Sequence, residues 1–405
     1  MKITQCRICN SKSLRNLFSL GKMKFTGKFP KKNQRIPSGD VHLVMCIKCS
    51  LVQLKDNFNL NYLYNKDYGY RTGINSTMRR HVKSVVSKVS KKAKLKIGDY
   101  VLDIASNDGT LLSYYKKNIN TFGIDPLVNK YKKDYKNINY KVSDFFSYKN
   151  ICKVNKNIKF KAITALSVFY DIKNPKIFLK DIKKVLHSDG IFNLEFADLK
   201  LILKNNMFDT ICHEHLEYYS VTVINNLLKK VGLRIFDHYY NDTNGGSSSY
   251  YICHKNAKFQ TSKKIPKVLI DEKRFKISSL ETYNKFKEKI DKIKKNLINL
   301  LRKLKAQKKV IHGYGASTKG NVLLQYFNID NKILDCVSDR NPKKNNCYTP
   351  GTNIKIITES KSRSLNPDYY LVLPWHFKSE ILKREKNIRR KGTKFIFPLP
   401  IPKII

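Results

Sequence analysis

Long apolar runs are missing from this chain of 405 residues. Without about 18 consecutive apolar residues it has no candidate membrane span, and its opening segment, MKITQCRICN, lacks the apolar core of a signal peptide. We therefore expect a cytoplasmic protein without a membrane partner. In that compartment, its nine cysteines are expected to be thiols or metal ligands rather than disulfides.

Acidic residues are scarce as well, because 31 Asp and Glu stand against 80 Lys and Arg, for a formal net charge of +49. Such a charge is typical of proteins that bind nucleic acid or anionic lipid. However, the lysines are scattered through every segment, and no arginine-rich or glycine–arginine block occurs. We therefore attribute the charge to overall composition and expect no specific nucleic-acid partner. The hydrophobic content of 41% predicts a folded chain, long enough for two or three domains.

The turn after the predicted strand Tyr100–Ile104 lacks Lys and Arg and has a single glycine, unlike most phosphate-binding loops. Asp103 and Asp108 make this region acidic, which disfavours pyrophosphate and favours a cofactor with hydroxyl groups and positive charge. S-adenosylmethionine (SAM) has both. We expect the turn to lead into a helix whose N-terminus faces the cofactor. The alternative is an ordinary strand–helix turn with incidental acids.

Polar residues also follow the next predicted strands. Asp125 ends a strand about 20 residues beyond the glycine turn, where an acid accepts hydrogen bonds from ribose hydroxyls. Asp144 and Phe145 are suited to the adenine amino group and ring. The alternation of strands and helices predicts a doubly wound parallel sheet, in the order typical of a class I methyltransferase. The predicted cofactor-binding residues are Asp103, Ala105, Asn107, Asp108, Gly109, Asp125, Asp144, Phe145 and Ser167.

Four cysteines form two matching pairs near the N-terminus, Cys6-x-x-Cys9 and Cys46-x-x-Cys49. Each pair can direct two thiolates at one ion, and two pairs complete the tetrahedral sulfur cage of a structural zinc site. All four positions are then filled by protein, so a catalytic metal is disfavoured. Four unrelated reduced cysteines are the alternative.

Titratable residues are dense in the run His213-Glu214-His215, beyond the end of a predicted strand. The HExxH zinc motif is excluded, because Glu217 stands where its second histidine would fall. A glutamate can orient an imidazole and raise its basicity, so that the imidazole removes a proton near pH 7. We therefore expect Glu214 and His215 to act together.

Other features suggest contacts with a ligand. The tyrosines Tyr68 and Tyr70 lie in a probable linker, where they either reach a cleft or pack as a hinge. The glycine turn at Gly246 could approach a ligand closely. The stretch 313–320, which contains Tyr314 and Lys319, would by itself indicate a dinucleotide turn. The amphipathic helix predicted over 277–304 is expected to bridge domains by packing.

Taken together, these motifs resemble the sugar C-methyltransferases that act on nucleotide-linked keto-deoxysugars. The resemblance implies a zinc ribbon (1–75), a SAM-binding class I domain (76–255), a helical linker (256–305) and a Rossmann-like α/β substrate domain (306–405). It implies that His215 is the base, with Glu214 beside it and Tyr70, or else Tyr68, at the sugar. Lys319, Tyr314 and Gly246 are then substrate-binding residues. We expect a small-molecule nucleotide-sugar substrate and a monomer or weak oligomer.

The chain departs from the family pattern at several residues. Cys212 replaces a tyrosine, Asp171 a histidine, Ala105 a glycine and His376 an asparagine. The first two put the sugar and the proton relay in doubt. Two alternatives stay open, the first motivated by these departures and the second by the net charge of +49. One is a degenerate, non-catalytic SAM-fold binding protein. The other is an RNA methyltransferase with a zinc-ribbon RNA reader, although the chain lacks an Asn/Asp-Pro-Pro-aromatic amine site and a Pro-Cys or Thr-Cys catalytic cysteine.

Overall fold

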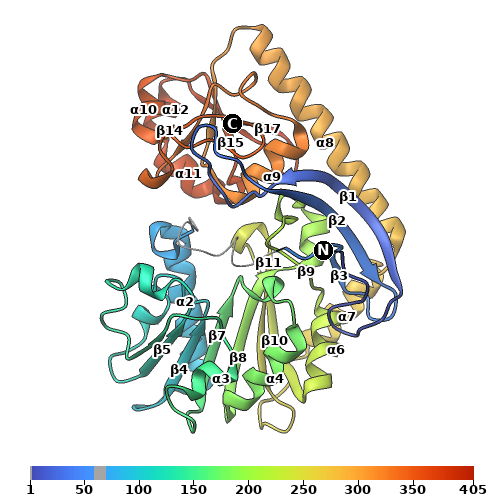
Figure 1. Ribbon diagram of the computed structural model, residues 1–405, viewed down its shortest axis with the longest axis vertical. Helices are drawn as coiled ribbons and strands as arrows, with labels where there is room; N and C mark the ends of the chain where they lie inside the picture. The colour runs from blue at the N-terminus through green and yellow to red at the C-terminus, as the bar shows by residue number, and fades with distance from the viewer. Residues whose placement is uncertain (1, 59–69) are drawn as a thin grey trace.

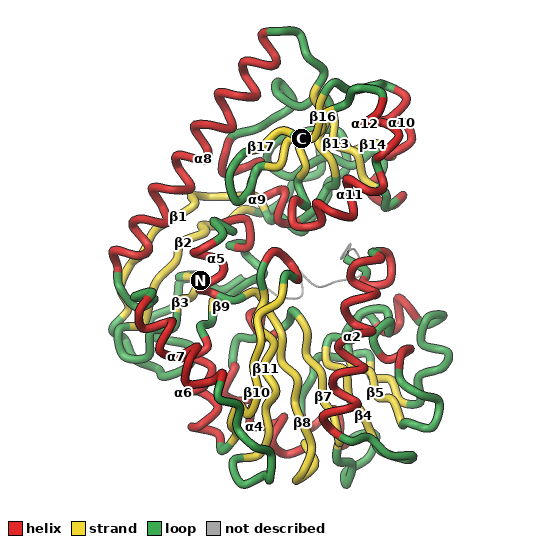
Figure 2. Tube along the Cα trace, turned by 180° about the vertical axis from the view of Figure 1, so that it is seen from behind, coloured by secondary structure: helices red, strands yellow, loops and turns green. Residues whose placement is uncertain are grey.

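The computed structural model describes residues 2–58 and 70–405, which build three sheets (Figure 1). The N-terminal sheet has the order β1-β2-β3-β9 and is antiparallel throughout. Its long strands curve along helix α8 in both views (Figure 1 and Figure 2). The fourth strand comes from the middle of the chain. The strands are β1 (Leu14–Lys24), β2 (Ser38–Cys46), β3 (Val52–Leu54) and β9 (Glu217–Tyr218).

The middle sheet has the order β10-β11-β8-β7-β4-β5-β6. Strands β4 to β8 run parallel, whereas β11 is antiparallel to both of its neighbours. This arrangement confirms the predicted class I methyltransferase sheet. Its strands are β4 (Tyr100–Ile104), β5 (Asn120–Ile124), β6 (Tyr140–Val142), β7 (Phe160–Leu166), β8 (Leu186–Ala197), β10 (Leu233–Asn241) and β11 (Ser247–His254).

The helices that cover this sheet are amphipathic. Apolar residues recur on one face of each, and that face is buried. Side chains begin two of them: Asn75 caps α2 and Ser220 caps α6. The helices and 3-10 turns of this region are η1 (Thr72–Ile74), α2 (Ser76–Ala93), η2 (Leu112–Tyr114), η3 (Val128–Tyr131), α3 (Tyr148–Cys152), η4 (Phe169–Asp171), α4 (Pro175–Val185), α5 (Leu199–Lys204), η5 (Phe208–Thr210), α6 (Val221–Val231), η6 (Thr243–Gly245) and α7 (Lys264–Arg274).

The prediction of a helix directly after β4 is wrong. The chain from Ala105 to Asn118 forms turns and the short η2 instead. Asn107 (φ 52°) and Gly109 (φ 72°) adopt the left-handed backbone, which a right-handed helix cannot contain. The buried Tyr135 fastens the turn, because its hydroxyl donates to the carbonyl of Asn107 at 3.0 Å. The turn therefore lacks the helix N-terminus that the sequence predicted.

The C-terminal sheet has the order β14-β13-β12-β15-β16-β17 and is parallel except for β17. It confirms the predicted α/β domain. Its elements are β12 (Ile311–Tyr314), α9 (Thr318–Phe327), β13 (Cys336–Asp339), η7 (Pro342–Lys344), β14 (Ile356–Thr358), α10 (Glu359–Ser364), β15 (Tyr369–Val372), η8 (Trp375–Phe377), α11 (Lys378–Arg384), α12 (Lys386–Arg390), β16 (Lys394–Phe397) and β17 (Lys403–Ile404).

Helix α8 (Leu280–Ala306) links the middle and C-terminal domains and begins three residues later than predicted. One of its faces is buried, and that face joins a core shared by the N-terminal sheet, η5 and the C-terminal sheet. Within it, the ring centroids of Phe18 and Phe286 lie 5.6 Å apart. The three sheets are thus packed through common cores. In the described part of the chain, helices long and apolar enough to cross a membrane are absent.

Candidate functional site

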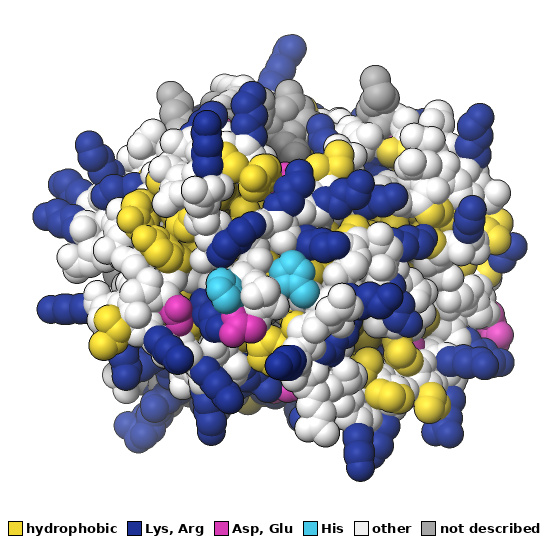
Figure 3. Space-filling view, turned by 90° about the horizontal axis from the view of Figure 1, so that it is seen from below, with side chains coloured by type: hydrophobic (Ala, Val, Ile, Leu, Met, Phe, Trp, Pro, Cys, Tyr) yellow, Lys and Arg dark blue, Asp and Glu magenta, His cyan; other side chains and the backbone are white. Residues whose placement is uncertain are grey.

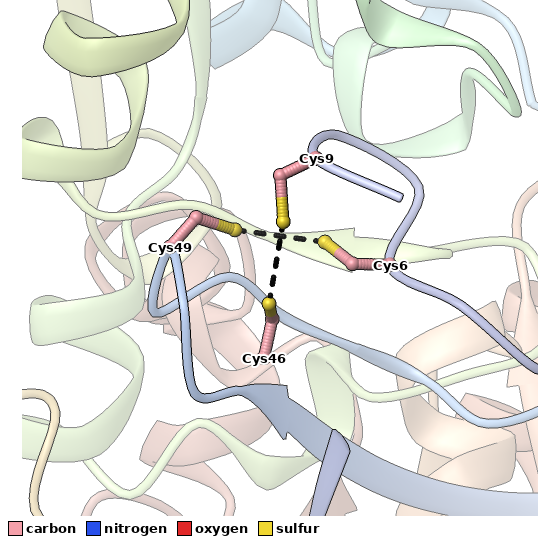
Figure 4. Close-up of side chains that lie close together, drawn as sticks. All are labelled: Cys6, Cys9, Cys46 and Cys49. Carbon is pink, nitrogen blue, oxygen red and sulfur yellow. Dashed lines mark hydrogen bonds between the residues drawn. The ribbon is translucent and has the colours of Figure 1, made fainter. Parts of the chain in front are cut away.

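Four cysteine thiols converge at the base of the N-terminal sheet (Figure 4). The sulfur atoms all lie within 4.8 Å of one another, and the Cys6–Cys49 and Cys9–Cys46 pairs are 3.5 Å apart. Cys6 and Cys46 are fully buried, and all four residues pack against the core of the middle domain. Four sulfur ligands at one point fit a tetrahedral zinc ion and leave no open coordination site. The predicted zinc residues are therefore brought together as a structural site.

A buried arginine ties the zinc site to the middle domain. The Arg7 guanidinium donates to the carbonyls of Leu54 (2.7 Å) and Asp56 (3.1 Å). Its Nε lies 3.7 Å from Oε1 of Glu217, at the start of β9. Burial raises the pKa of Glu217 well above its usual range, and the charge of Arg7 opposes that shift. Arg7 therefore joins the zinc ribbon to strand β9, which begins two residues after His215.

The turn after β4 has the conformation expected of a site that cofactor atoms approach closely. Ala105 stands in the left-handed region (φ 56°), where glycine is favoured. The carboxylate of Asp125 accepts from the backbone N–H groups of Asn107 (2.9 Å) and Leu127 (2.6 Å). Asp125 therefore holds the end of β5 against the turn, and burial raises its pKa.

The two acids that first indicated a cationic cofactor have protein partners. Asp103 is buried and accepts from Thr164 Oγ1 at 2.6 Å. Burial raises the pKa of Asp103 to about 7, with the Thr164 hydrogen bond acting against the shift. Asp108 accepts from Arg71 Nε (3.0 Å) and from the N–H of Gly73 (2.9 Å). In this structure Asp108 therefore anchors the linker.

The remaining predicted cofactor residues are dispersed. Asp144 and Phe145 lie after the edge strand β6 and are both exposed, Phe145 by 44%. Asp144 accepts from the N–H of Phe145 at 2.7 Å, so its carboxylate is partly used locally. Ser167 lies after β7 with φ 55°, and its hydroxyl accepts from Asn244 Nδ2 at 3.2 Å.

His215 is held by the backbone. Its Nδ1 lies 2.6 Å from the carbonyl oxygen of Thr210. Because that oxygen can only accept, Nδ1 carries the proton and Nε2 keeps its lone pair. Burial lowers the pKa of His215 to about 4, and the positive charge of Lys319 contributes to the shift. The imidazole is therefore neutral near pH 7, and its ring packs 4.1 Å from that of Tyr170.

Glu214 does not orient this imidazole as predicted. Its Oε2 accepts from Thr26 Oγ1 at 3.4 Å, and a Cβ built at Gly27 would lie 2.4 Å from Oε1. The buried carboxylate thus faces the N-terminal domain, because consecutive side chains in this turn diverge. The carbonyl of Thr210 fixes the ring of His215 instead.

Lys319 lies between the middle and C-terminal domains, at the first turn of α9. Its Nζ donates to the carbonyl of Asn244 at 2.7 Å, and burial lowers its pKa, against the charge of Asp209. Asn244 therefore touches both Lys319 and the cofactor-side Ser167. Asn244 and Asp209 were not predicted from the sequence. Asp209 is a buried acid four residues before the run His213-Glu214-His215, and Asn244 directly precedes the glycine pair Gly245-Gly246.

Two predicted substrate contacts are corrected. Tyr314 is 3% exposed in the C-terminal core, where its hydroxyl donates to Glu385 (2.8 Å) and contacts the Arg384 guanidinium. Gly246 is buried, and a Cβ there would lie 3.0 Å from Cβ of Leu201 in α5. Both residues serve packing. The glycine allows close approach to protein rather than to a ligand.

Of the two predicted linker tyrosines, the structure describes Tyr70. Tyr70 is 46% exposed, and its carbonyl accepts from Asn107 Nδ2 at 3.3 Å, which places it beside the cofactor turn. Tyr68 lies outside the described residues. Of the departures from the family pattern, Cys212 is buried in the shared core, and burial raises its pKa well above the usual range.

Three family models match successive parts of the chain. A "Putative zinc binding domain" matches residues 6–64, a "Methyltransferase domain" residues 74–238 and a "C-methyltransferase C-terminal domain" residues 242–400. The C-methyltransferase NovU of Streptomyces niveus is 26% identical over 409 residues, which cover 100% of this chain and 97% of that protein.

Two solved methyltransferase structures each match less than half of the chain. A SAM-dependent methyltransferase from Clostridium acetobutylicum ATCC 824 is 16% identical, over 44% of this chain and 92% of its own, with a TM-score of 0.36. Magnesium protoporphyrin IX methyltransferase (ChlM) from Synechocystis PCC 6803, with bound SAM, is 15% identical over 44% of this chain and 79% of its own, with a TM-score of 0.33.

Proposed function

We propose that this chain, which matches in succession models of a zinc-binding domain, a methyltransferase domain and a C-methyltransferase C-terminal domain, methylates a carbon of a nucleotide-linked keto-deoxysugar with SAM as the methyl donor. The observation that carries this proposal is the state of His215. Its ring is neutral, its Nδ1 is held by Thr210, and its Nε2 is left to accept a proton. A neutral imidazole can take the proton of a carbon next to a ketone where a nearby positive charge stabilises the enolate that forms.

In the proposed reaction, Nε2 of His215 takes the proton from the carbon beside the ketone. The electron pair of the broken C–H bond moves into an enolate, whose carbon then forms the new bond to the methyl group. Bound SAM supplies that methyl group and leaves as S-adenosylhomocysteine. Lys319, whose charge already acts on His215, would stabilise the negative charge of the enolate or of the substrate diphosphate.

The cofactor is assigned to the end of β4 and β5. Its ribose would exchange hydrogen bonds with Asp125, which stands at the carboxyl end of β5. Its adenine would stack on the exposed Phe145 beside Asp144, so that binding would bury a ring that is 44% exposed. The backbone of Ala105 to Gly109 would pass close to the methionine part, with Ser167 on the opposite side. Tyr70, or else Tyr68, would contact the sugar.

The test is turnover of dTDP-, GDP- and CDP-linked keto-sugars with SAM, followed by mass spectrometry. We expect a gain of one methyl group at carbon with at least one substrate. His215→Gln should retain SAM binding by calorimetry and lose methyl transfer by about 10²–10⁴-fold, the usual contribution of a general base. A variant with near-normal turnover would refute the role given to His215. His187→Gln, which changes a partly exposed histidine at the start of β8, is the matched control.

The structure gives less support to an RNA methyltransferase. The cysteine site packs into the core of the middle domain instead of extending from it as a separate reader. Lys and Arg side chains are spread over the face in Figure 3 rather than gathered in one patch. Tight, sequence-selective RNA binding that survives high salt would favour that alternative. Failure to bind SAM would favour a non-catalytic protein.

A further inference from the structure

Trp375 is the single tryptophan of the chain and lies where the C-terminal domain meets two loops of the middle domain. It belongs to η8 and is 8% exposed. Its Nε1 donates to Oδ2 of Asp209 at 2.8 Å, across 166 positions of sequence. A buried indole N–H needs such an acceptor, and a buried carboxylate needs such a donor.

The acceptor belongs to the loop that orients His215. Asp209 is fully buried within η5. The next residue, Thr210, supplies the carbonyl that accepts a hydrogen bond from the Nδ1–H of His215. Loss of the indole N–H would leave the Asp209 carboxylate without the donor seen at Oδ2. A shift of η5 to recover a partner would move the Thr210 carbonyl with it.

The same indole packs on the second loop. A Cβ built at Gly245 would lie 2.9 Å from Cη2 and 3.3 Å from Cζ2 of the ring. The preceding residue, Asn244, donates to Ser167 on the cofactor side and accepts from Lys319 of the C-terminal domain. The ring edge and the ring nitrogen of Trp375 therefore fix two separate loops.

We infer that Trp375 is a positioning residue through which the C-terminal domain holds the η5 and η6 loops in one relative arrangement, and so sets the base His215 against the cofactor side of the site. The inference rests on the proposed function only for the role of His215 as base. The contacts that carry it connect Trp375 with the η5 and η6 loops whether or not the acceptor is a sugar.

The sharpest variant replaces the indole nitrogen alone. Because the chain has one tryptophan, 3-benzothienylalanine can be incorporated at residue 375 without altering another site. This residue keeps the bicyclic ring over Gly245 and removes the donor to Asp209. Trp375→Phe removes the donor with a smaller ring. Phe395→Leu, in the buried strand β16 of the same domain, controls for general loss of core packing.

The first readout is the tautomer of His215, followed by ¹⁵N NMR with His215→Gln used to assign its signals. We expect both residue-375 replacements to lower the fraction of Nδ1–H tautomer, with SAM affinity within about threefold and kcat reduced at least tenfold. Phe395→Leu should lower the melting temperature and leave the tautomer of the folded protein unchanged. An unchanged tautomer in the benzothienyl protein would overturn the inference.

The second readout uses the fluorescence of Trp375 itself. Gly245→Ala introduces a Cβ at 2.9 Å from the ring, and we expect it to shift the tryptophan emission and lower kcat together. An emission shift with unchanged kcat would also overturn the inference. If no keto-sugar is a substrate, the proposed function fails, but the tautomer measurement needs no substrate and still decides the positioning role.

Discussion

The proposed base, His215, can accept a proton only while its Nε2 lone pair is free, so in the proposed reaction its pKa sets the acid limit of methyl transfer. Burial lowers that pKa to about 4, below the value of about 6.5 for an imidazole in water. The neutral form therefore persists as the pH falls through 6.5 and is lost only near pH 4. Burial thus keeps the proposed base, His215, unprotonated across the physiological pH range.

We predict that the acid limb of kcat/KM for methyl transfer lies near pH 4–5. The measurement is a pH profile of initial rates over the range in which circular dichroism shows a folded protein. An acid limb centred near pH 6.5 would mean that the base titrates as an exposed histidine and would contradict the assignment.

Ala105 stores backbone strain in the cofactor turn. A left-handed conformation costs an L-residue about 1–2 kcal/mol, and glycine escapes that cost while losing part of the gain to its more flexible unfolded state. We predict that Ala105→Gly raises the free energy of unfolding by about 0.5–1 kcal/mol. Denaturant unfolding measures it. Ala165→Gly, in the extended strand β7, should instead lower stability by about 1 kcal/mol.

At the scale of elements, successive residues of the segment 70–75 bind the turn after β4, residues 105–109, which is called the cofactor turn. The N–H of Thr72 donates to Asn107 Oδ1 at 3.0 Å, and the N–H of Gly73 donates to Asp108. Arg71 bridges Asp108 and Asp134, at 3.0 and 2.8 Å. The linker and the turn therefore keep one another in place, which connects Tyr70 to the turn after β4.

We predict that Arg71→Met loosens both elements. Hydrogen–deuterium exchange of the 70–75 and 105–110 peptides should rise, and SAM affinity should fall several-fold. Lys83→Met, on the exposed face of α2, is the matched control and should change neither. Unchanged exchange in the Arg71 variant would show that the backbone hydrogen bonds suffice without the ion pair.

The elements also show how far the sequence could be read. The cysteine spacing and the polar strand ends located the zinc site and the end of the middle sheet that carries the cofactor turn, because both depend on local chain geometry. The contact predicted between Glu214 and His215 was not found, because the partner of Glu214 is Thr26, which lies 188 residues away, and no local pattern encodes that contact. Trp375 and Asp209 escaped notice for the same reason. Tyr314 looked like a ligand contact, but the fold turns it into the core.

At the scale of the whole molecule, the zinc ribbon supports the site at a distance. The path runs from the cysteines through Arg7 to Glu217 and β9, and thus to the segment that contains His215. Removing the ion would release the loops that bring the cysteines together and would free Arg7 from its carbonyl acceptors.

We predict that Cys9→Ser lowers bound zinc from one ion per chain to well below one. The melting temperature should fall by about 5 °C or more, which corresponds to roughly 2 kcal/mol for a domain of this size. Metal analysis and thermal unfolding provide the measurements. Cys152→Ser, outside the cysteine cluster, should retain zinc and stability. Full zinc content in Cys9→Ser would exclude the four-sulfur site.

The pairing of β3 with β9 has a consequence for biosynthesis. Gln53 pairs with Glu217, so the outer edge of β3 has no partner until about 160 more residues have been made. At about 5–20 residues per second, that interval lasts on the order of 10–30 s. During it, the nascent N-terminal sheet presents an open strand edge, the kind of surface that chaperones cover and aggregates exploit. Its completion is timed by translation of the methyltransferase domain.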